Sequence, residues 1–264
     1  MEVFGITPFD GLSAAQIAVL GLIYFGAFFV KGVFGFGAVP LLIVAGSFVV
    51  TPHHAVILAA VTNLVTHLQY IPEGWRNGQR ALVGRLIVYV IPAIAVGVVI
   101  FAQLGGGSLS ILAGIIILGS VLTDALRLLD PLAPMVRRQA RIVGPVFGVI
   151  SGLISGIVGA GSIAFIGLYV RMFAPDRQGF RATIILMVAA AIVWRTSVLA
   201  VTGLITGALL IEAAILLPGS VLSGELGARL SKRISDRGFF TAYRVVLCTG
   251  ALLMIWRGMA PAPG

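Results

Sequence analysis

Two basic side chains stand in apolar stretches of the chain, where a charge is costly. Lys31 directly precedes a glycine-rich sequence, and Arg195 lies inside Ala189–Leu199, several residues from either end of its hydrophobic segment. A charge within a membrane segment costs roughly 2.5 kcal/mol or more on insertion scales, so it normally faces a cavity or a partner. A bound anion would satisfy both cations, and a guanidinium suits bidentate recognition of an oxyanion. Two alternatives stay open: snorkelling of Lys31 to a surface, and an ion pair of Arg195 with Glu212 or Glu225.

The glycine pattern GxxGxG occurs twice, once directly after Lys31 and once in the second half of the chain. Its glycines are Gly32, Gly35 and Gly37 in the first copy and Gly156, Gly159 and Gly161 in the second. A helix that breaks at such a motif exposes backbone N–H groups, which favour negative charge. Phe36, Ala160 and Ser162 therefore join the glycines as candidates for contact with an anion. The alternative is close helix packing through small residues, which is also our interpretation of the ladder Gly144, Gly148, Gly152 and Gly156.

One other hydrophobic stretch carries a cluster of polar side chains, Asn63, Thr66 and His67. Asn63 and His67 are four residues apart and share a helix face. Asn63 and Thr66 could hydrogen-bond an oxyanion, and His67 could carry a proton near neutral pH. The alternative is that the three side chains hold neighbouring helices together.

Further candidates stand singly. Trp194 could wall a site beside Arg195 or pack against lipid or a helix. Glu212 is a candidate for ion coupling, or a counter-ion. His53 and His54 follow Pro52 and are expected in a solvated loop.

The composition of the chain indicates whether these residues lie in a soluble protein or in a membrane protein. Of the 264 residues, 59% are hydrophobic and only 10% are charged, with a mean hydropathy of +1.10, whereas soluble domains carry about 25% charged residues. The chain is therefore an integral membrane protein without a sizeable soluble domain. Its uninterrupted apolar runs favour helices over the alternating pattern of a β-barrel. A single cysteine and the lack of a His/Cys cluster predict no disulfide, no metal and no cofactor.

Hydrophobic runs between glycines, prolines and charges predict ten segments. They are 14–31, 38–50, 54–71, 81–103, 108–123, 142–156, 161–173, 182–202, 206–228 and 239–256. The second and the seventh are too short to cross a hydrocarbon core that takes about 20 helical residues. Each of them follows a glycine motif, and short, glycine-interrupted segments at corresponding positions indicate discontinuous helices at a transport site.

The two glycine motifs and two prolines recur at nearly constant spacing, because Pro52 corresponds to Pro175 and Pro92 to Pro218. We therefore predict one transmembrane domain, 1–264, made of two repeats over about 14–125 and 140–257 and joined by a basic linker, 126–141. Since five segments per repeat is an odd number, the second repeat should enter the membrane from the opposite side.

The positions of the basic residues agree with such inversion. Loops that carry arginines in one half have uncharged counterparts in the other, as for Arg76, Arg80 and Arg85 against 203–207, and for Arg229, Lys232, Arg233 and Arg237 against 104–108. Most basic residues then fall on one face, which the positive-inside rule makes cytoplasmic, with both termini outside. This distribution explains the net charge of +9 without nucleic acid.

Residues 28–42, Phe-Phe-Val-Lys-Gly-Val-Phe-Gly-Phe-Gly-Ala-Val-Pro-Leu-Leu, resemble the first repeat motif of the sulfite exporter TauE/SafE family, or TSUP permeases. Residues 152–162, Gly-Leu-Ile-Ser-Gly-Ile-Val-Gly-Ala-Gly-Ser, resemble the second. The likeness covers about 14–257 and implies transport of sulfite, organosulfonates, thiosulfate or related organic anions. The chain departs from the family pattern at Ala38 and Ser162, where a third glycine is frequent, and at Thr62-Asn63, where a serine or threonine is.

Taken together, these patterns predict an all-α polytopic membrane protein with two inverted repeats, each containing a glycine-broken or re-entrant helical hairpin. We expect a secondary transporter of small sulfur-containing anions that works by alternating access in the cytoplasmic (inner) membrane of a prokaryote. A GxxxxGK[ST] motif is missing, which argues against an ATP-driven pump. The alternatives are a passive anion channel, a transporter of another small organic anion, and an intramembrane hydrolase using Ser162 and His67.

Overall fold

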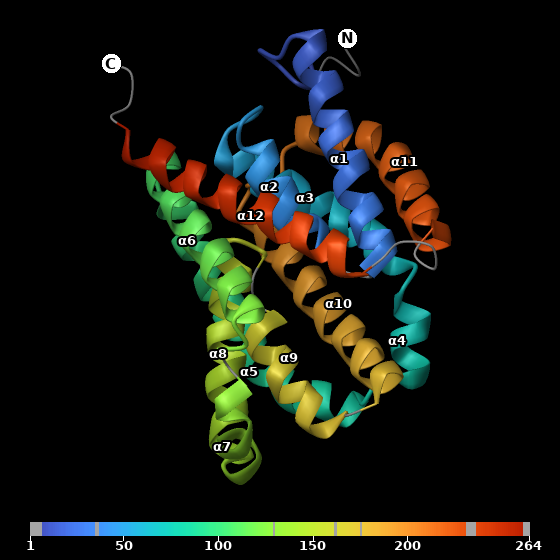
Figure 1. Ribbon diagram of the computed structural model, residues 1–264. Coiled ribbons are helices and arrows are strands. Elements are labelled where there is room, and N and C mark those ends of the chain that lie inside the picture. Colours follow the sequence, from blue (N-terminus) through green and yellow to red (C-terminus); the bar gives the residue numbers. More distant parts are fainter. Residues whose placement is uncertain are drawn as a thin grey trace. The chain divides into compact units, whose positions relative to one another are not determined.

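The computed structural model (Figure 1) describes residues 7–34, 37–128, 130–160, 163–174, 176–230 and 236–260, and every regular element in these ranges is helical. The elements are α1 (Ala14–Phe34), α2 (Ala38–Gly46), α3 (Pro52–Leu68), α4 (Ile71–Asn77), α5 (Arg80–Gln103), α6 (Gly106–Ala125), η1 (Asp130–Leu132), α7 (Ala133–Arg138), α8 (Ala140–Ile157), α9 (Ile163–Phe173), α10 (Arg177–Val201), α11 (Gly207–Leu230) and α12 (Asp236–Met259). The ten predicted segments correspond to α1, α2, α3, α5, α6 and α8 to α12. The elements α4, η1 and α7 lie in the connections between them.

Several of these helices are long and apolar enough to cross a membrane. Within the described ranges there are six, in α1, α5, α6, α8, α10 and α11, or up to seven if α3 and α4 form one span bent by 59°. The chain is thus a multi-pass membrane protein. The short segments α2 and α9 have 9 and 11 residues, about half of what a span requires. Both glycine motifs fall at helix ends, the first between α1 and α2 and the second between α8 and α9.

The chain forms two compact units, each built from segments distant in sequence. Unit 1 comprises Met1–Thr66, Gly105–Ile115 and Leu199–Gly264, and unit 2 comprises His67–Leu104 and Ile116–Val198. Each unit therefore takes helices from both predicted repeats.

In unit 1, α1 lies along α11, and α2 packs against both α1 and α12 (Figure 1). Glycine makes the α1–α11 crossing close. A Cβ at Gly32 would overlap the carbonyl oxygen of Gly224, and a Cβ at Gly227 would overlap that of Phe29. At this point the two backbones are in direct contact, as in small-residue packing of membrane helices.

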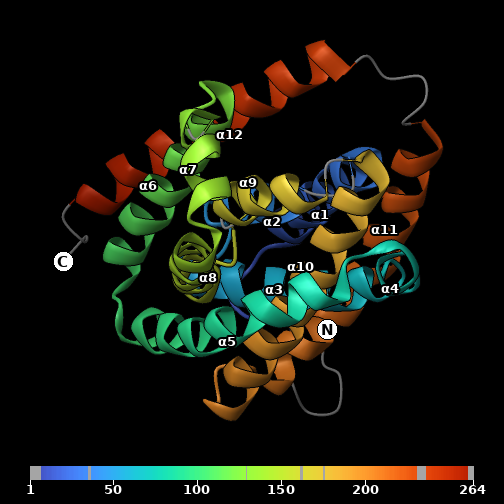
Figure 2. The ribbon, with the colours of Figure 1, turned by 90° about the horizontal axis from the view of Figure 1, so that it is seen from below.

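In unit 2, α8 lies along α5 and also contacts α9; Figure 2 looks down α8 with α5 beside it. The glycine ladder of α8 makes this contact, which confirms its interpretation as a packing surface. Gly148, Gly152 and Gly156 face α5, where Gly156 meets the backbone of Ile94 and Gly97. The remaining member, Gly144, faces the ring of Tyr169 on α9.

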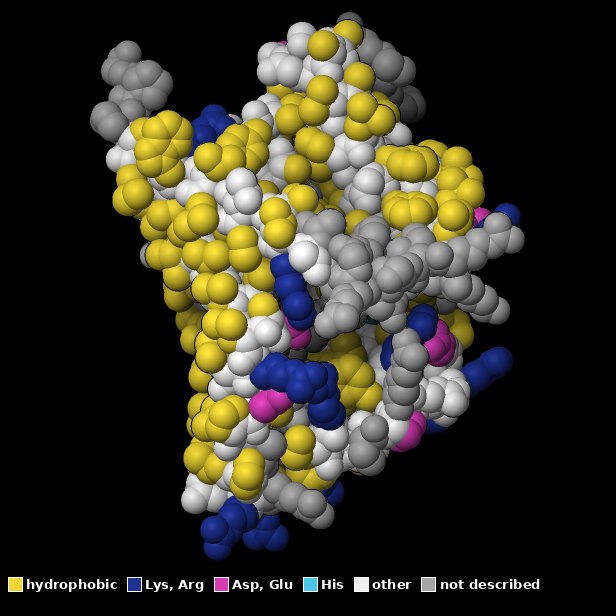
Figure 3. Space-filling view, in the orientation of Figure 1, with side chains coloured by type: hydrophobic (Ala, Val, Ile, Leu, Met, Phe, Trp, Pro, Cys, Tyr) yellow, Lys and Arg dark blue, Asp and Glu magenta, His cyan; other side chains and the backbone are white. Residues whose placement is uncertain are grey.

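Large apolar side chains cover the outer faces of the helices. Exposed examples are Leu22 on α1, Val88 and Val96 on α5, Leu222 on α11 and Trp256 on α12. Figure 3 shows many hydrophobic side chains along one edge of the molecule, with Lys and Arg at its lower end, near α7. A surface so rich in apolar groups requires lipid or another apolar covering.

Candidate functional site

Lys31 is buried inside unit 1, near the end of α1, with its side chain 4% exposed. Its ammonium donates to Asn63 Oδ1 at 2.6 Å and to Thr66 Oγ1 at 3.0 Å, and it lies 5.4 Å from the centre of the Phe28 ring. Asn63 and Thr66 are three residues apart on α3, so one helix face presents both acceptors. The snorkelling alternative is therefore wrong. These two acceptors are uncharged, so they solvate the ammonium without cancelling its charge.

Arg195 is buried in unit 2, with 3% of its side chain exposed, and leans against the second glycine motif. Its Nε donates to the carbonyl oxygen of Gly156 at 3.3 Å. Its Nη2 is buried without a hydrogen-bond partner, and no carboxylate in the described ranges forms an ion pair with it. A buried N–H of a charged group without an acceptor is costly. The Nη2 group of Arg195 can thus donate to an acceptor that does not belong to the described chain.

The guanidinium fits at this place because residue 159 is glycine. A Cβ at Gly159 would lie 3.0 Å from Arg195 Nη1 and 3.1 Å from Cζ, and the backbone there has φ +78°. Both the left-handed conformation and the lack of a side chain favour glycine. Neighbouring Ala160 is buried. The second motif is therefore a cradle for an arginine side chain.

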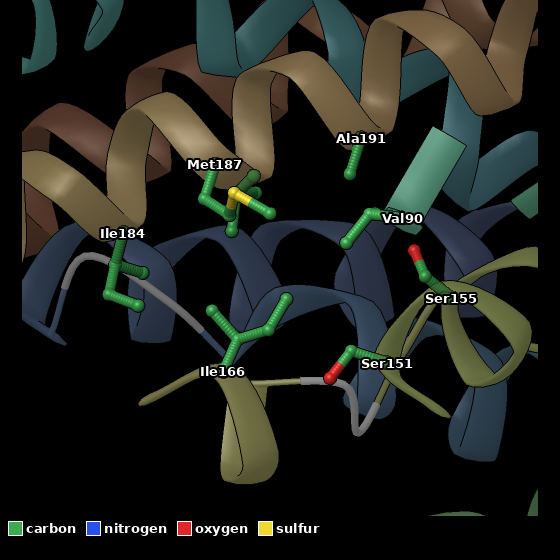
Figure 4. Close-up of a pocket in the computed structure, with 8 residues that line it drawn as sticks. Val90, Ser151, Ser155, Ile166, Ile184, Met187 and Ala191 are labelled. Atoms are coloured by element: carbon green, nitrogen blue, oxygen red, sulfur yellow. The ribbon is translucent and has the colours of Figure 1, made fainter. Parts of the chain in front are cut away.

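Unit 2 also holds a small pocket that is open on one side (Figure 4). It is lined by Val90, Ser151, Ser155, Ile166, Ile184, Met187, Val188 and Ala191. Ser155 adjoins Gly156 in sequence, and Ala191 lies one helical turn before Arg195 on α10. Apart from the two serines, the walls of the pocket are apolar.

The first glycine motif has a different neighbour. Gly37, at φ +99°, caps the start of α2, and a Cβ there would lie 2.9 Å from the Tyr243 hydroxyl. That hydroxyl donates to the carbonyl oxygen of Gly37 at 3.3 Å. Four other candidates, Gly35, Phe36, Gly161 and Ser162, lie outside the described residues. Gly32 and Gly156 are the close-packing positions of α1 and α8 described above.

Two further candidates contact neighbouring helices of unit 2. The indole of Trp194, 37% exposed, donates to the carbonyl oxygen of Ile91 on α5 at 2.9 Å. His67 is buried, and its Nε2 lies 3.1 Å from the carbonyl oxygen of Ile185 on α10. Because that carbonyl can only accept, Nε2 carries the proton in this contact. His67 thus links the end of α3 to α10.

Glu212 is paired with groups other than Arg195. In unit 1 its carboxylate accepts from the backbone N–H of Phe9 at 2.8 Å and lies 2.5 Å from Nε2 of His54. The other carboxylate considered for Arg195, Glu225, pairs with Arg229. The alternative of an ion pair between Arg195 and either glutamate is therefore wrong.

The expectation of a solvated loop at His54 is wrong as well, because Pro52 starts α3 and both histidines lie in its first turn. Proline suits the first helical turn, where its missing N–H costs nothing. A signal for the contact was present in the sequence. The predicted topology put His54 and Glu212 on the same side of the membrane, and a buried carboxylate needs a partner.

The fold and these sites define a polytopic helical membrane protein that keeps cations buried beside breaks in its helices. A family model described as sulfite exporter TauE/SafE matches residues 20–254. The chain belongs to the sulfite exporter TauE/SafE family, whose members are transporters and not enzymes, so the hydrolase alternative is set aside. Neither a curated protein nor a solved structure matches the chain.

Proposed function

We propose that this protein is a secondary transporter of small sulfur oxyanions, such as sulfite or an organosulfonate, that works by alternating access. The observation that carries the proposal is the buried Arg195, whose Nη2 has no acceptor in the described chain. A bound oxyanion would supply both the missing acceptor and the opposite charge, and a guanidinium binds oxyanions in bidentate geometry. Family membership favours sulfite or a related anion.

In unit 1, Lys31 would neutralise an anion at the first motif, with Asn63 and Thr66 in direct reach. Backbone N–H groups of both glycine motifs and the Ser162 hydroxyl would add hydrogen bonds, as helix N-termini do for anions.

The helix pairing supports the proposed inverted repeats. In unit 1, the first segment of repeat 1 (α1) packs along the fourth segment of repeat 2 (α11), and in unit 2 the first segment of repeat 2 (α8) packs along the fourth of repeat 1 (α5). The same pairing thus occurs twice with the repeats exchanged. Inverted repeats that rock against each other are a common basis of alternating access. We further propose a prokaryotic inner membrane, with basic loops in the cytoplasm and both termini outside.

The first test is a thermal-shift series on the purified protein in detergent. Sulfite, sulfate, thiosulfate, sulfoacetate and taurine are compared with matched carboxylates, because a ligand that binds only the folded state raises Tm. We expect sulfite to raise Tm of the wild type and Arg195→Met to lower its affinity about 10- to 100-fold, the equivalent of about 1.5–3 kcal/mol for a charged hydrogen bond.

Lys31→Met is expected to weaken binding as well, whereas Arg195→Lys should keep part of it. The matched control is Arg76→Met, since Arg76 is exposed on α4. Stabilisation by carboxylates alone would refute the sulfur assignment. If Arg195→Met lowers Tm without changing the response to any anion, Arg195 is structural. Saturable sulfite counterflow in vesicles is expected of a transporter, and its lack would favour a channel.

A further inference from the structure

A polar cluster in unit 1 is not used by the anion sites. Glu212 on α11 has only 3% of its side chain exposed. Two nitrogen groups, one from the backbone and one from an imidazole, lie at hydrogen-bond distance from its carboxylate. The backbone N–H of Phe9 donates to Oε1 at 2.8 Å, and His54 Nε2 lies 2.5 Å from Oε2. A buried carboxylate held in this way has a defined place for a negative charge and a titratable partner for a proton.

The N-terminal turn shields the carboxylate. Phe9 is buried and adopts φ +58°, a left-handed conformation that non-glycine residues rarely take. The turn is closed by a hydrogen bond from the Leu12 N–H to the Phe9 carbonyl oxygen at 3.0 Å. This conformation directs the backbone N–H of Phe9 towards Glu212. The contacts of the turn offset the cost of this conformation. Strain of this kind is often found at functional sites.

His54 is the more exposed partner of the covered carboxylate. Its side chain is 32% exposed, about ten times as much as that of Glu212. An imidazole is the side chain whose ordinary titration range lies nearest to neutral pH. A proton bound by His54 can therefore pass on to Glu212 Oε2 while the carboxylate stays covered.

Further polar groups of unit 1 lie on α1 and α3, the helices that carry Lys31 and its two acceptors. The Tyr24 hydroxyl on α1 is buried and has no hydrogen-bond partner in the described part of the chain. Thr66, one turn beyond Thr62 on α3, accepts from Lys31. Tyr24 and Lys31 are seven residues apart on α1, so they share a face. The helix rise puts Thr66 about 18 Å along α3 from His54.

The described part of unit 1 holds other titratable or charged groups. Asp10 stands on the N-terminal turn and is exposed, and His53 precedes His54 on α3. Tyr24 is buried on α1. Arg257 on α12 donates to the carbonyl oxygen of Ser47, on the segment that leads into α3.

The geometry points to a proton-binding site at His54 and Glu212 that couples proton movement to the anion. This inference rests on the proposed anion transport. With one proton the pair is neutral overall, as imidazolium with carboxylate or as imidazole with carboxylic acid, and without it the pair carries one negative charge. Movement of one proton with one monovalent anion is electroneutral. Only O–H and N–H bonds form and break, and the proton returns to water on the far side of the membrane.

The test uses the full chain in lipid vesicles, with sulfite as the probe and pH gradients of both signs. For the wild type, we expect sulfite uptake to rise several-fold when the sulfite side is acidic. Glu212→Gln should lose this response while sulfite exchange without a gradient persists, and His54→Gln should reduce the response. The matched controls Glu225→Gln, on the same helix, and His53→Gln, beside His54, should respond like the wild type.

A second measurement avoids dependence on the Glu212 variant. Calorimetry of sulfite binding to the wild type in two buffers of different ionisation enthalpy counts the protons taken up, and we expect uptake that His54→Gln diminishes. Wild-type exchange that ignores the pH gradient, or a Glu212→Gln variant that responds to it fully, would overturn the proton site and leave the proposed transport intact. Lack of any sulfite exchange by the wild type would overturn both.

Discussion

The two glycine motifs have the same spacing and each falls at the end of a long helix, but their surroundings differ. In unit 1, Gly37 meets the Tyr243 hydroxyl, and the buried cation Lys31 is solvated by Asn63 and Thr66 from α3. In unit 2, the motif itself receives the cation, because Gly159 leaves room for the Arg195 guanidinium. A duplicated backbone pattern has thus been combined with two different ways of keeping a charge inside the protein.

The difference follows from the chemistry of the two cations. An ammonium is a compact charge with three donors, and two side-chain oxygens at hydrogen-bond distance suit it. A guanidinium is planar and wide, and here it lies against backbone that lacks a Cβ. Its unused Nη2 makes unit 2 the better candidate for direct contact with the substrate anion, and Lys31 the better candidate for setting the local charge.

The largest effect is expected where the two units are alike, at the helix crossings. Gly32→Leu and Gly156→Leu should each cost more than about 3 kcal/mol, because backbone atoms of α11 or α5 cannot move aside as a side chain can. Yield and thermal unfolding in detergent measure the loss. Gly21→Leu on α1 and Gly84→Leu on α5 are the controls, since nothing lies within 4 Å of either. Equal tolerance of all four variants would contradict the close crossing.

The next effect should separate the two motifs. Gly159→Ala and Gly37→Ala both put a side chain at positive φ, which costs roughly 1–2 kcal/mol. Only Gly159→Ala also displaces Arg195, so we expect it to weaken sulfite binding about tenfold, and Gly37→Ala to weaken it less. Tm with and without sulfite measures both effects. If the two variants lose binding equally, Arg195 has no special part in it.

Within unit 1, removal of one acceptor tests how Lys31 is kept buried. Asn63→Ala should destabilise the protein by about 1–3 kcal/mol, because the ammonium loses an acceptor in a buried place. Asn63→Asp should recover stability by supplying a counter-charge, and should weaken anion binding because the new carboxylate competes. Asn77→Ala, at an exposed position on α4, is the control for unfolding measurements. An Asn63→Asp variant with unaltered anion affinity would remove Lys31 from the site.

The smallest effect is expected at Trp194 in unit 2. Trp194→Phe removes the hydrogen bond to Ile91 and should cost about 0.5–1.5 kcal/mol of stability. Sulfite affinity should stay unchanged, because the indole contacts α5. A parallel fall in affinity would show instead that Trp194 walls the anion site.

Much of the fold was predictable because each helix is indicated by residues that are near one another in the chain. Apolar runs, prolines and glycines indicated ten segments, and the helices follow them closely, including the short α2 and α9. The same reasoning picked out Lys31 and Arg195, because a cation in an apolar run stands out whatever surrounds it. His54 was missed for the opposite reason: beside a proline, in a short polar stretch, nothing in its own neighbourhood indicates a buried partner.

By itself, the sequence determined the solvent of this protein, its helices, the places where they break and the charges that had to be compensated, since these depend on residues near in the chain. The tertiary structure decided which groups compensate these charges. Asn63 and Thr66 serve Lys31, the backbone at Gly156 and Gly159 receives Arg195, and Phe9 and His54 meet Glu212. Such partners come from segments far apart in sequence, and only the close packing of glycine-lined helices brings their atoms within hydrogen-bond distance.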